Sequence, residues 1–211
     1  MLTISDIPPL LAGLIVGFYW ARVIKLVLKT RKLTGKAANF VPPEPLGRLL
    51  RILWYPTVVA WIVLPLIGAL WRDAPQFIRA YRDLPVLHWT GLLIAILAMG
   101  ATLVCWKRMG KSWRMGIDPN EKTRLVFSGP FAYVRHPIYA LSSVLMLATL
   151  AAAPSPALGI AAFIHLLFLQ WEARREERYL VQAHGPTYEN YMRNVGRFAP
   201  RSLTPYRTTG D

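Results

Sequence analysis

Residues 129–139 bring together an arginine, a histidine and three aromatic residues immediately before an apolar run. Ionisable side chains at the boundary of a membrane are costly to place, so they usually mark a functional site. The guanidinium of Arg135 can bind a carboxylate through two hydrogen bonds, and the ring faces of Phe131 and Tyr139 can stabilise a cation. Pro137 also suits the first turn of a helix. The segment is therefore a candidate functional site at the edge of a bilayer. A plainer interpretation stays open, in which Arg135 and His136 anchor a helix end at lipid phosphates.

A second group of ionisable residues follows at helical spacing. His165, Glu172 and Glu176 are seven and four positions apart, so they share one face of a helix. A face with an imidazole inside an apolar segment and carboxylates at its end should point into the bundle or into a cavity. Two plainer interpretations stay open: His165 as an interhelical hydrogen-bonding residue, and Glu176 with Glu177 as a solvated charged surface.

The elements that position these residues are predicted to be membrane spans. Hydrophobic residues make up 54% of the 211-residue chain, and they are concentrated in blocks. Arg22 and Lys25 interrupt the first block, but their long side chains can reach the interface. The last two blocks are short and joined by an uncharged connection, which predicts a tight helical hairpin. The sequence thus predicts an all-α integral membrane protein with about five spans, at 8–28, 49–70, 86–106, 137–153 and 156–171.

The distribution of charge predicts the orientation. Residues 22–51 carry eight Lys/Arg and one acid, residues 107–135 carry seven Lys/Arg and two acids, and the connection between the last two spans carries no charge. Cytoplasmic loops hold the excess of Lys/Arg. We therefore expect an external N-terminus and a cytoplasmic C-terminus in a bacterial inner membrane or its equivalent. The net charge of +14 then reflects this orientation and contact with lipid headgroups. Because the basic residues alternate with apolar blocks, we expect no nucleic-acid partner.

Common soluble catalytic motifs are missing from the sequence. The 14 glycines are too far apart for a phosphate-binding or dinucleotide-binding loop. The four histidines are dispersed and Cys105 is the single cysteine, so no metal-ligand spacing and no internal disulfide are predicted. No serine lies in a nucleophile elbow. The two groups of ionisable residues remain as the candidate site.

Several motifs occur in a fixed order. The sequence Gly-Pro-Phe-Ala-Tyr-Val-Arg-His-Pro-Ile-Tyr at 129–139 precedes the apolar hairpin and the Glu176–Glu177 pair. Gly-x-x-Tyr-x-x-Tyr at 185–191 and Arg-Phe-x-Pro at 197–200 follow. This order resembles the isoprenylcysteine carboxyl methyltransferase family, and more broadly the membrane methyltransferases that include phospholipid N-methyltransferases. The resemblance covers about residues 107–201.

The resemblance implies a methyltransferase that uses S-adenosylmethionine without a soluble Rossmann domain. Arg135, His136 and Glu176 would be its catalytic residues. His165 and Glu172 would line the site of a lipophilic small-molecule or prenylated acceptor. By analogy with the family, the cofactor-binding residues would be Thr123, Arg124, Leu125, Val126, Phe131, Tyr133, Arg135, His136, Pro137, Ile138, Tyr139 and Glu176.

The family relationship also suggests a division of the chain. We expect N-terminal transmembrane helices at 1–106, a methyltransferase core with a cytoplasmic cofactor-binding region at 107–201, and a mobile tail at 202–211. Glu172 stands where the eukaryotic enzymes carry an arginine linked to acceptor recognition. The acceptor therefore stays open among a carboxylate, an amine and a thiol. An NADPH-dependent membrane reductase of the sterol-reductase type and a non-catalytic membrane scaffold are the alternative functions.

Overall fold

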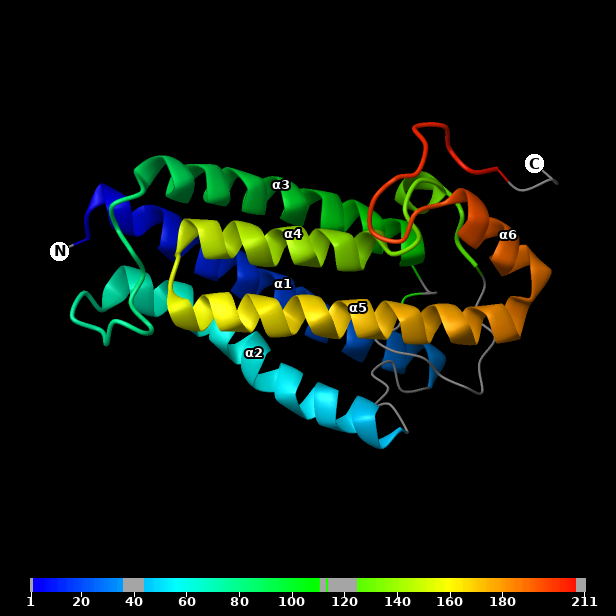
Figure 1. The fold of residues 1–211 in the computed structure, drawn as a ribbon, viewed down its shortest axis with the longest axis horizontal. Helices are drawn as coiled ribbons and strands as arrows, with labels where there is room; N and C mark the ends of the chain where they lie inside the picture. The colour runs from blue at the N-terminus through cyan, green and yellow to red at the C-terminus, as the bar shows by residue number, and fades with distance from the viewer. Residues whose placement is uncertain (1, 36–43, 111–112, 114–124, 208–211) are drawn as a thin grey trace.

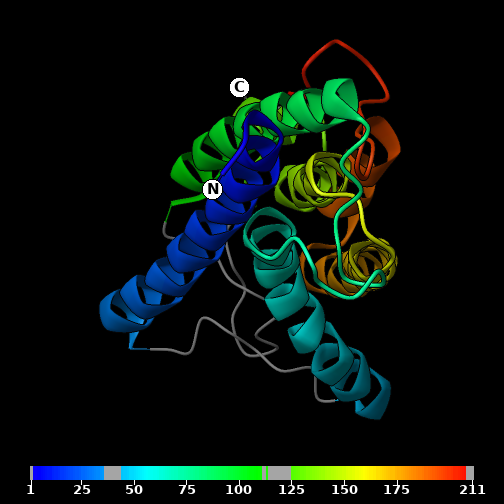
Figure 2. The same cartoon turned by 90° about the vertical axis from the view of Figure 1, so that its left-hand side faces the viewer.

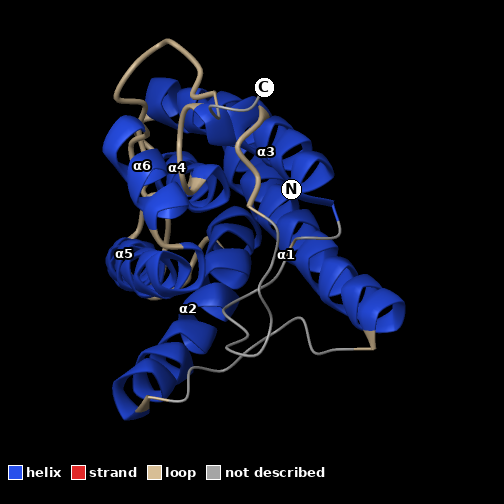
Figure 3. Ribbon diagram, turned by 90° about the vertical axis from the view of Figure 1, so that its right-hand side faces the viewer, coloured by secondary structure: helices blue, strands red, loops and turns tan. Residues whose placement is uncertain are grey.

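The computed structural model of the protein describes residues 2–35, 44–110, 113 and 125–207. The regular structure of these residues is helical, apart from one parallel bridge between Val134 and Gly196 (Figure 3). The all-α class predicted from the sequence is confirmed for this part of the chain.

The described α-helices all begin with a proline in the first or second position. Proline lacks the backbone N–H that the first turn leaves unpaired, and its fixed φ already suits a helix. These prolines explain why the helices begin where they do. The helices are α1 (Ile7–Thr34), α2 (Pro45–Leu70), α3 (Pro85–Met109), α4 (Pro137–Ala152), α5 (Pro156–His184) and α6 (Pro186–Asn194) (Figure 1).

Four of the described helices, α1, α2, α3 and α5, are long and apolar enough to cross a membrane. The apolar helix α4 has 16 residues, which corresponds to about 24 Å. The structure thus confirms a helical membrane protein with four candidate spans. The shorter α4 occupies the position of the predicted fourth of five spans.

Helix α4 is held between α3 and α5 (Figure 1). Its contact with α3 is the most extensive in the bundle. Gly91 of α3 allows this approach, because a Cβ atom there would lie 2.6 Å from both the Ala148 O and the Ala152 N. A short turn leads from α4 to α5, where the Ser155 Oγ accepts a hydrogen bond from the Leu158 N at 3.3 Å. Helix α5 has 29 residues and extends well past the first turn of α4.

The two ends of the bundle differ. At one end the C-terminal part of α1 and the N-terminal part of α2 diverge (Figure 2). At the other end the carboxylate of Asp6, which is 1% exposed, accepts hydrogen bonds from Arg82 and, at 2.8 Å, from Arg72. This ion-pair cluster ties the N-terminus to the connection between α2 and α3. The candidate site lies at the diverging end.

Candidate functional site

A cavity lies where α1 and α2 diverge. It has about 830 Å³ of empty space, counting the part that is open to solvent. Small-molecule sites of proteins commonly fall in this size range. Every wall carries aromatic side chains, which come from α1 to α5 and from the connections around residues 113 and 131. They are Tyr19, Trp20, Trp54, Trp106, Trp113, Phe131, Tyr139 and Phe168.

Most of the predicted site residues line this cavity. They are Phe131, Arg135, His136, Pro137, Ile138, Tyr139, Glu172 and Glu176. Leu125 and Val126 are half-buried away from it, and Leu125 packs against a cluster formed by Tyr188, Tyr191 and Val195. Tyr133 lines a separate apolar groove between α3 and α4. The predicted residues Thr123 and Arg124 lie outside the described residues.

The segment after α6 returns to the site and pairs with the chain just before α4. The Arg135 N donates to the Gly196 O at 2.8 Å, and the His136 N donates to the Arg197 O at 3.0 Å. Gly196 has no room for a side chain, because a Cβ atom would lie 1.9 Å from the Ala199 O. The backbone of this C-terminal segment therefore fixes the position of Arg135 and His136.

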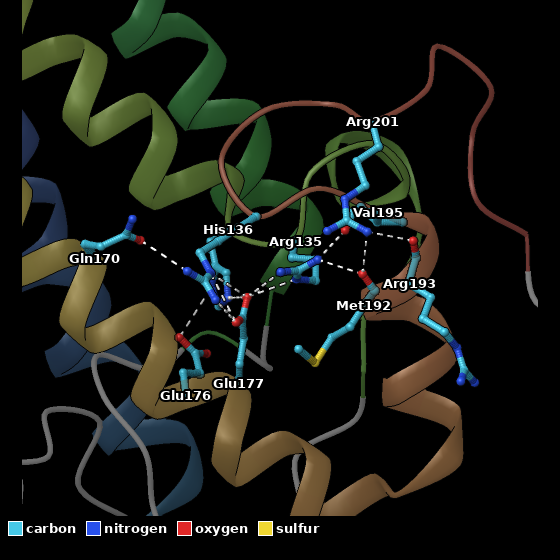
Figure 4. A network of polar contacts seen from close by, with 10 residues as sticks. Arg135, His136, Gln170, Glu176, Glu177, Met192, Arg193, Val195 and Arg201 are labelled. Atoms are coloured by element: carbon cyan, nitrogen blue, oxygen red, sulfur yellow. Dashed lines mark hydrogen bonds and ion pairs between the residues drawn. The ribbon is translucent and has the colours of Figure 1, made fainter.

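Glu177 is the centre of the polar network at this junction (Figure 4). Its carboxylate is 4% exposed and accepts a hydrogen bond from the Arg135 Nε at 2.9 Å. The Arg197 guanidinium binds the same carboxylate, with Nη2 at 2.5 Å from Oε2. These hydrogen bonds raise the pKa of Arg197 above its ordinary value. Glu177 thus joins α5 to the segment before α4 and to the segment after α6.

Arg135 is fully engaged by protein groups. Besides the bonds to Glu177, its Nη1 donates to the Met192 O at 3.0 Å and to the Val195 O. Charge-assisted bonds of this kind are among the stronger hydrogen bonds in proteins. The geometry makes Arg135 a residue that holds the C-terminal segment in place.

His136 lies between two carboxylates. Its Nδ1 is 3.6 Å from the Glu176 Oε2, and its Nε2 is 3.3 Å from the Glu177 Oε1. Among the described residues, the buried Nε2 has no partner with hydrogen-bond geometry. The imidazole is nearly parallel to the Tyr139 ring, with 5.4 Å between the ring centroids. His136 is therefore held at the cavity wall between the two carboxylates.

The adjacent acids Glu176 and Glu177 differ in surroundings. Glu177 is buried within the arginine network, whereas the Glu176 side chain is 29% exposed and lines the cavity. The contact to His136 at 3.6 Å is too long for a good hydrogen bond. Glu176 is thus the carboxylate of the pair that is available to a molecule in the cavity.

Glu172 lies one turn before Glu176 and is 3% exposed. Its Oε1 is 3.3 Å from the Arg175 Nη1, and Arg175 also approaches the Glu44 Oε1 at 3.3 Å. The Glu172 Oε2 has no hydrogen-bond partner in the part of the chain that the structure describes. Glu172 is therefore a buried carboxylate at the cavity wall, and one of its oxygens lacks a hydrogen-bond partner among the described residues.

His165 lies beneath this cavity and does not line it. The imidazole is fully buried, its Nδ1 accepts a hydrogen bond from the Trp54 Nε1 at 3.1 Å, and its Nε2 is 3.1 Å from the Ser142 Oγ. Both partners line the cavity. The contacts match the interhelical hydrogen-bonding interpretation, and they connect α2, α4 and α5.

Tyr191 of α6 also supports the site. Burial raises the pKa of its phenol, which keeps the hydroxyl protonated. That hydroxyl donates to the Phe131 O at 2.5 Å. Tyr206, in the predicted mobile tail, donates its N–H to the Ala132 O at 2.9 Å and contacts the Tyr191 ring. Helix α6 and the following segment thus cover the 129–139 segment.

The sequence analysis missed the contribution of α1 and α2. Arg51 of α2 is buried, and its Cζ lies 5.5 Å from the Trp54 ring centroid and 5.8 Å from that of Phe168. An arginine three positions before a tryptophan at the start of an apolar helix is the signal that was available.

Within the described residues, no group of three or more His, Cys, Asp or Glu side chains is arranged to hold a metal ion.

The fold and the cavity define a class of protein, namely helical membrane proteins with an aromatic cavity that carries charged side chains at one end of the bundle. Residues 90–182 match the family model described as the isoprenylcysteine carboxyl methyltransferase (ICMT) family. The matched range includes the 129–139 segment, α4 and both cavity carboxylates, Glu172 and Glu176. The match confirms the resemblance that the motif order indicates.

Two curated proteins are similar to the chain. The cobalt-zinc-cadmium resistance protein CzcN of Cupriavidus metallidurans is 30% identical over 143 residues, which cover 65% of this chain and 64% of CzcN. The nickel-cobalt-cadmium resistance protein NccN of Alcaligenes xylosoxydans xylosoxydans is 30% identical over 115 residues, which cover 53% of each chain. The similarity therefore spans less than two thirds of either relative.

Proposed function

We propose that the protein transfers a methyl group from S-adenosylmethionine to a lipophilic acceptor at the boundary between membrane and cytoplasm. One observation carries the proposal. Glu176 and His136 come from different helical segments and line one aromatic cavity. Both residues also fall within the range that matches the methyltransferase family.

The residues of the cavity fit the chemical groups of S-adenosylmethionine. The cofactor carries a sulfonium, an ammonium, a carboxylate and ribose hydroxyls. The carboxylate of Glu176 suits the ammonium or the hydroxyls, and His136 lines the cavity beside it as a second polar side chain. Phe131 and Tyr139 offer ring faces for a cation. When bound, the cofactor supplies a methyl group that is already activated for displacement.

The protein residues then act mainly by positioning. Arg135 and Glu177 hold the C-terminal segment against the cavity, so that His136 and the aromatic wall are fixed before a ligand binds. Ordered reactants and exclusion of water lower the barrier of a transfer reaction. Arg135, which the sequence analysis placed among the catalytic residues, supports the cavity through its contacts with Glu177, Met192 and Val195.

An apolar groove supports a lipophilic acceptor. It lies between α3 and α4, and its lining residues include Cys105, Val144 and Phe198. Pro137 lines both this groove and the aromatic cavity. We propose that the acceptor enters from the bilayer through this side of the bundle. Its polar end then reaches the cavity near α5.

The proposed topology has five crossings, with α4 as the short one. The N-terminus lies outside and the cavity end faces the cytoplasm, in a bacterial inner membrane or an equivalent membrane. Residues 1–106 then form the N-terminal spans, and residues 107–201 form the methyltransferase core. This orientation gives a soluble cofactor access to Glu176.

Calorimetric titration of the detergent-purified full chain tests the proposed function. We expect S-adenosylmethionine to bind in the micromolar range. Glu176→Gln should weaken binding about tenfold, because it removes the charge of the available carboxylate. Glu189→Gln is the matched control, since Glu189 is exposed on α6 away from the cavity.

The same titration with NADPH separates the alternatives. Binding of NADPH without S-adenosylmethionine would favour a membrane reductase. Binding of neither cofactor would favour a scaffold. Either result would overturn the methyltransferase proposal.

A further inference from the structure

The free oxygen of Glu172 is unusual for a buried carboxylate. The side chain is 4% exposed, and the Oε2 has no hydrogen-bond partner among the residues described. A buried acceptor without a partner loses its hydration without gaining a hydrogen bond, and the loss is larger for a charged acceptor. Because Glu172 lines the cavity, a hydrogen-bond donor within the cavity is the natural partner of this oxygen.

The protein neutralises this carboxylate only in part. Arg175 reaches the Glu172 Oε1 at 3.3 Å, but its Nε is also 3.3 Å from Glu44. Neither distance is that of a short charge-assisted bond, for which about 2.7–2.9 Å is typical. Arg51, which lines the same cavity, is the other positive charge that acts on Glu172. The second oxygen of Glu172 therefore lacks a hydrogen-bonded countercharge.

The cavity walls carry further aromatic faces. The guanidinium of Arg51 lies over the rings of Trp54 and Phe168, so a cation of the protein itself occupies these two faces. Trp20 and Trp106 line the same cavity. Aromatic faces combined with a carboxylate are a common way to bind an ammonium group. A carboxylate ligand would meet the two acidic side chains Glu172 and Glu176 on α5, and Arg51 is the positively charged side chain on the α2 side of the same cavity.

We propose that the methyl acceptor is a lipophilic amine, and that Glu172 selects it by accepting a hydrogen bond from its ammonium group. In a transfer the ammonium would first give one proton to this carboxylate. The neutral amine would then form the new nitrogen–carbon bond as the carbon–sulfur bond of the donor breaks and a neutral thioether leaves. This inference rests on the proposed methyltransferase function, because it names the acceptor class of the same cavity. In this proposal Glu176 binds the cofactor and Glu172 binds the acceptor. The two carboxylates are one helical turn apart on the same face of α5.

Binding of three matched probes tests the proposal without methyl transfer. Octylamine, octanol and octanoate share one alkyl chain and differ in the charge of the head group. Quenching of tryptophan fluorescence reports their binding to the detergent-purified full chain, with detergent alone as the blank. We expect octylamine to bind at least tenfold more tightly than octanoate.

Variants at position 172 connect this preference to one side chain. Glu172→Gln should reduce the preference for octylamine over octanoate at least tenfold and leave octanol binding unchanged. Glu172→Asp, which keeps the charge, should retain the preference even if Glu172→Gln fails to fold. The exposed control Glu189→Gln should behave as the wild type.

Parallel titration with S-adenosylmethionine separates the two proposals. If the cofactor binds but octylamine is not preferred, the amine assignment is overturned and the methyltransferase proposal is not. The same holds if the cofactor binds and the preference for octylamine persists in Glu172→Gln. A preference for octanoate would also overturn it and would favour a carboxylate acceptor held by Arg51. Absence of cofactor binding in the wild type would overturn the methyltransferase function.

Discussion

Glu176 and Glu177 are adjacent on α5 but contact different parts of the protein. Successive side chains on an α-helix are about 100° apart, so neighbours face different surroundings. Glu177 turns toward Arg135 and Arg197, while Glu176 turns toward the cavity. Sequence spacing therefore placed Glu176 on the same face as Glu172, and Glu177 on another.

Glu177→Gln should destabilise the protein. It would leave the buried Arg135 without its charged partner and weaken the bonds of Arg197. Breaking a buried pair of this kind costs about 3 kcal/mol. Equilibrium unfolding in mixed detergent micelles measures the loss, with Glu189→Gln as the exposed control. An unchanged unfolding free energy would contradict the role of Glu177 as the centre of the network.

The sequence predicted part of this site at the level of residues. The unusual composition of residues 129–139 and the spacing of Glu172 and Glu176 are local patterns, and the structure brings side chains from both to one cavity. The contributions of Arg51 and Arg197 were not predicted. Arg51 meets Phe168 through the packing of α2 on α5, which are more than a hundred residues apart in the chain. Arg197 reaches Glu177 because the segment after α6 folds back onto α5. Helical periodicity carries no information about either contact.

At the level of elements, the prolines and apolar blocks predict the helices well. The sequence analysis ended the fifth span at Trp171, whereas α5 continues to His184. Hydropathy detects the apolar part of a helix and not its charged continuation. The continuation carries Glu172, Glu176 and Glu177, so the length of α5 beyond the apolar zone is what brings these acids to the cavity.

Two glycines of α3 provide a matched test of helix packing. Gly91→Ala should destabilise the bundle, because the new Cβ atom would lie 2.6 Å from backbone atoms of α4. Gly100→Ala should be neutral or stabilising by up to about 1 kcal/mol, since alanine favours helix and no atom lies within 4 Å of the added Cβ. Thermal unfolding of both variants in the same detergent measures the difference. Equal midpoints would argue against close packing of α3 on α4.

At the level of the whole molecule, the orientation in the membrane was predicted from the charges of the connections between spans. The fold neutralises some of these charges. Arg72 and Arg82 belong to the connection that the sequence analysis placed outside. Both pair with Asp6, so the effective positive charge of this connection is lower than its sequence suggests. Counting charged residues could not reveal this pairing, because Asp6 lies in a different part of the chain. The pairing strengthens the proposal that this end is external.

Accessibility of single cysteines in membrane vesicles tests the orientation. In a Cys105→Ala background, Gln76→Cys reports the end of the bundle near Asp6, and Thr187→Cys reports the end near the cavity. Both native side chains are exposed. A membrane-impermeant maleimide should label Gln76→Cys from outside intact cells and Thr187→Cys only in inside-out vesicles. The reverse pattern would require the opposite orientation.

The contact between Glu177 and Arg197 has a consequence for biosynthesis. Translation proceeds from the N-terminus, so α1 to α5 can enter the membrane before Arg197 has been made. During that interval Glu177 lacks one of its two arginine partners, and the wall carrying Arg135 and His136 lacks the strand-like pairing with Gly196. The cavity is therefore completed only after the five helices α1 to α5 have been synthesised. A nascent chain interrupted before this point would be inserted in the membrane but incompetent to bind its ligands.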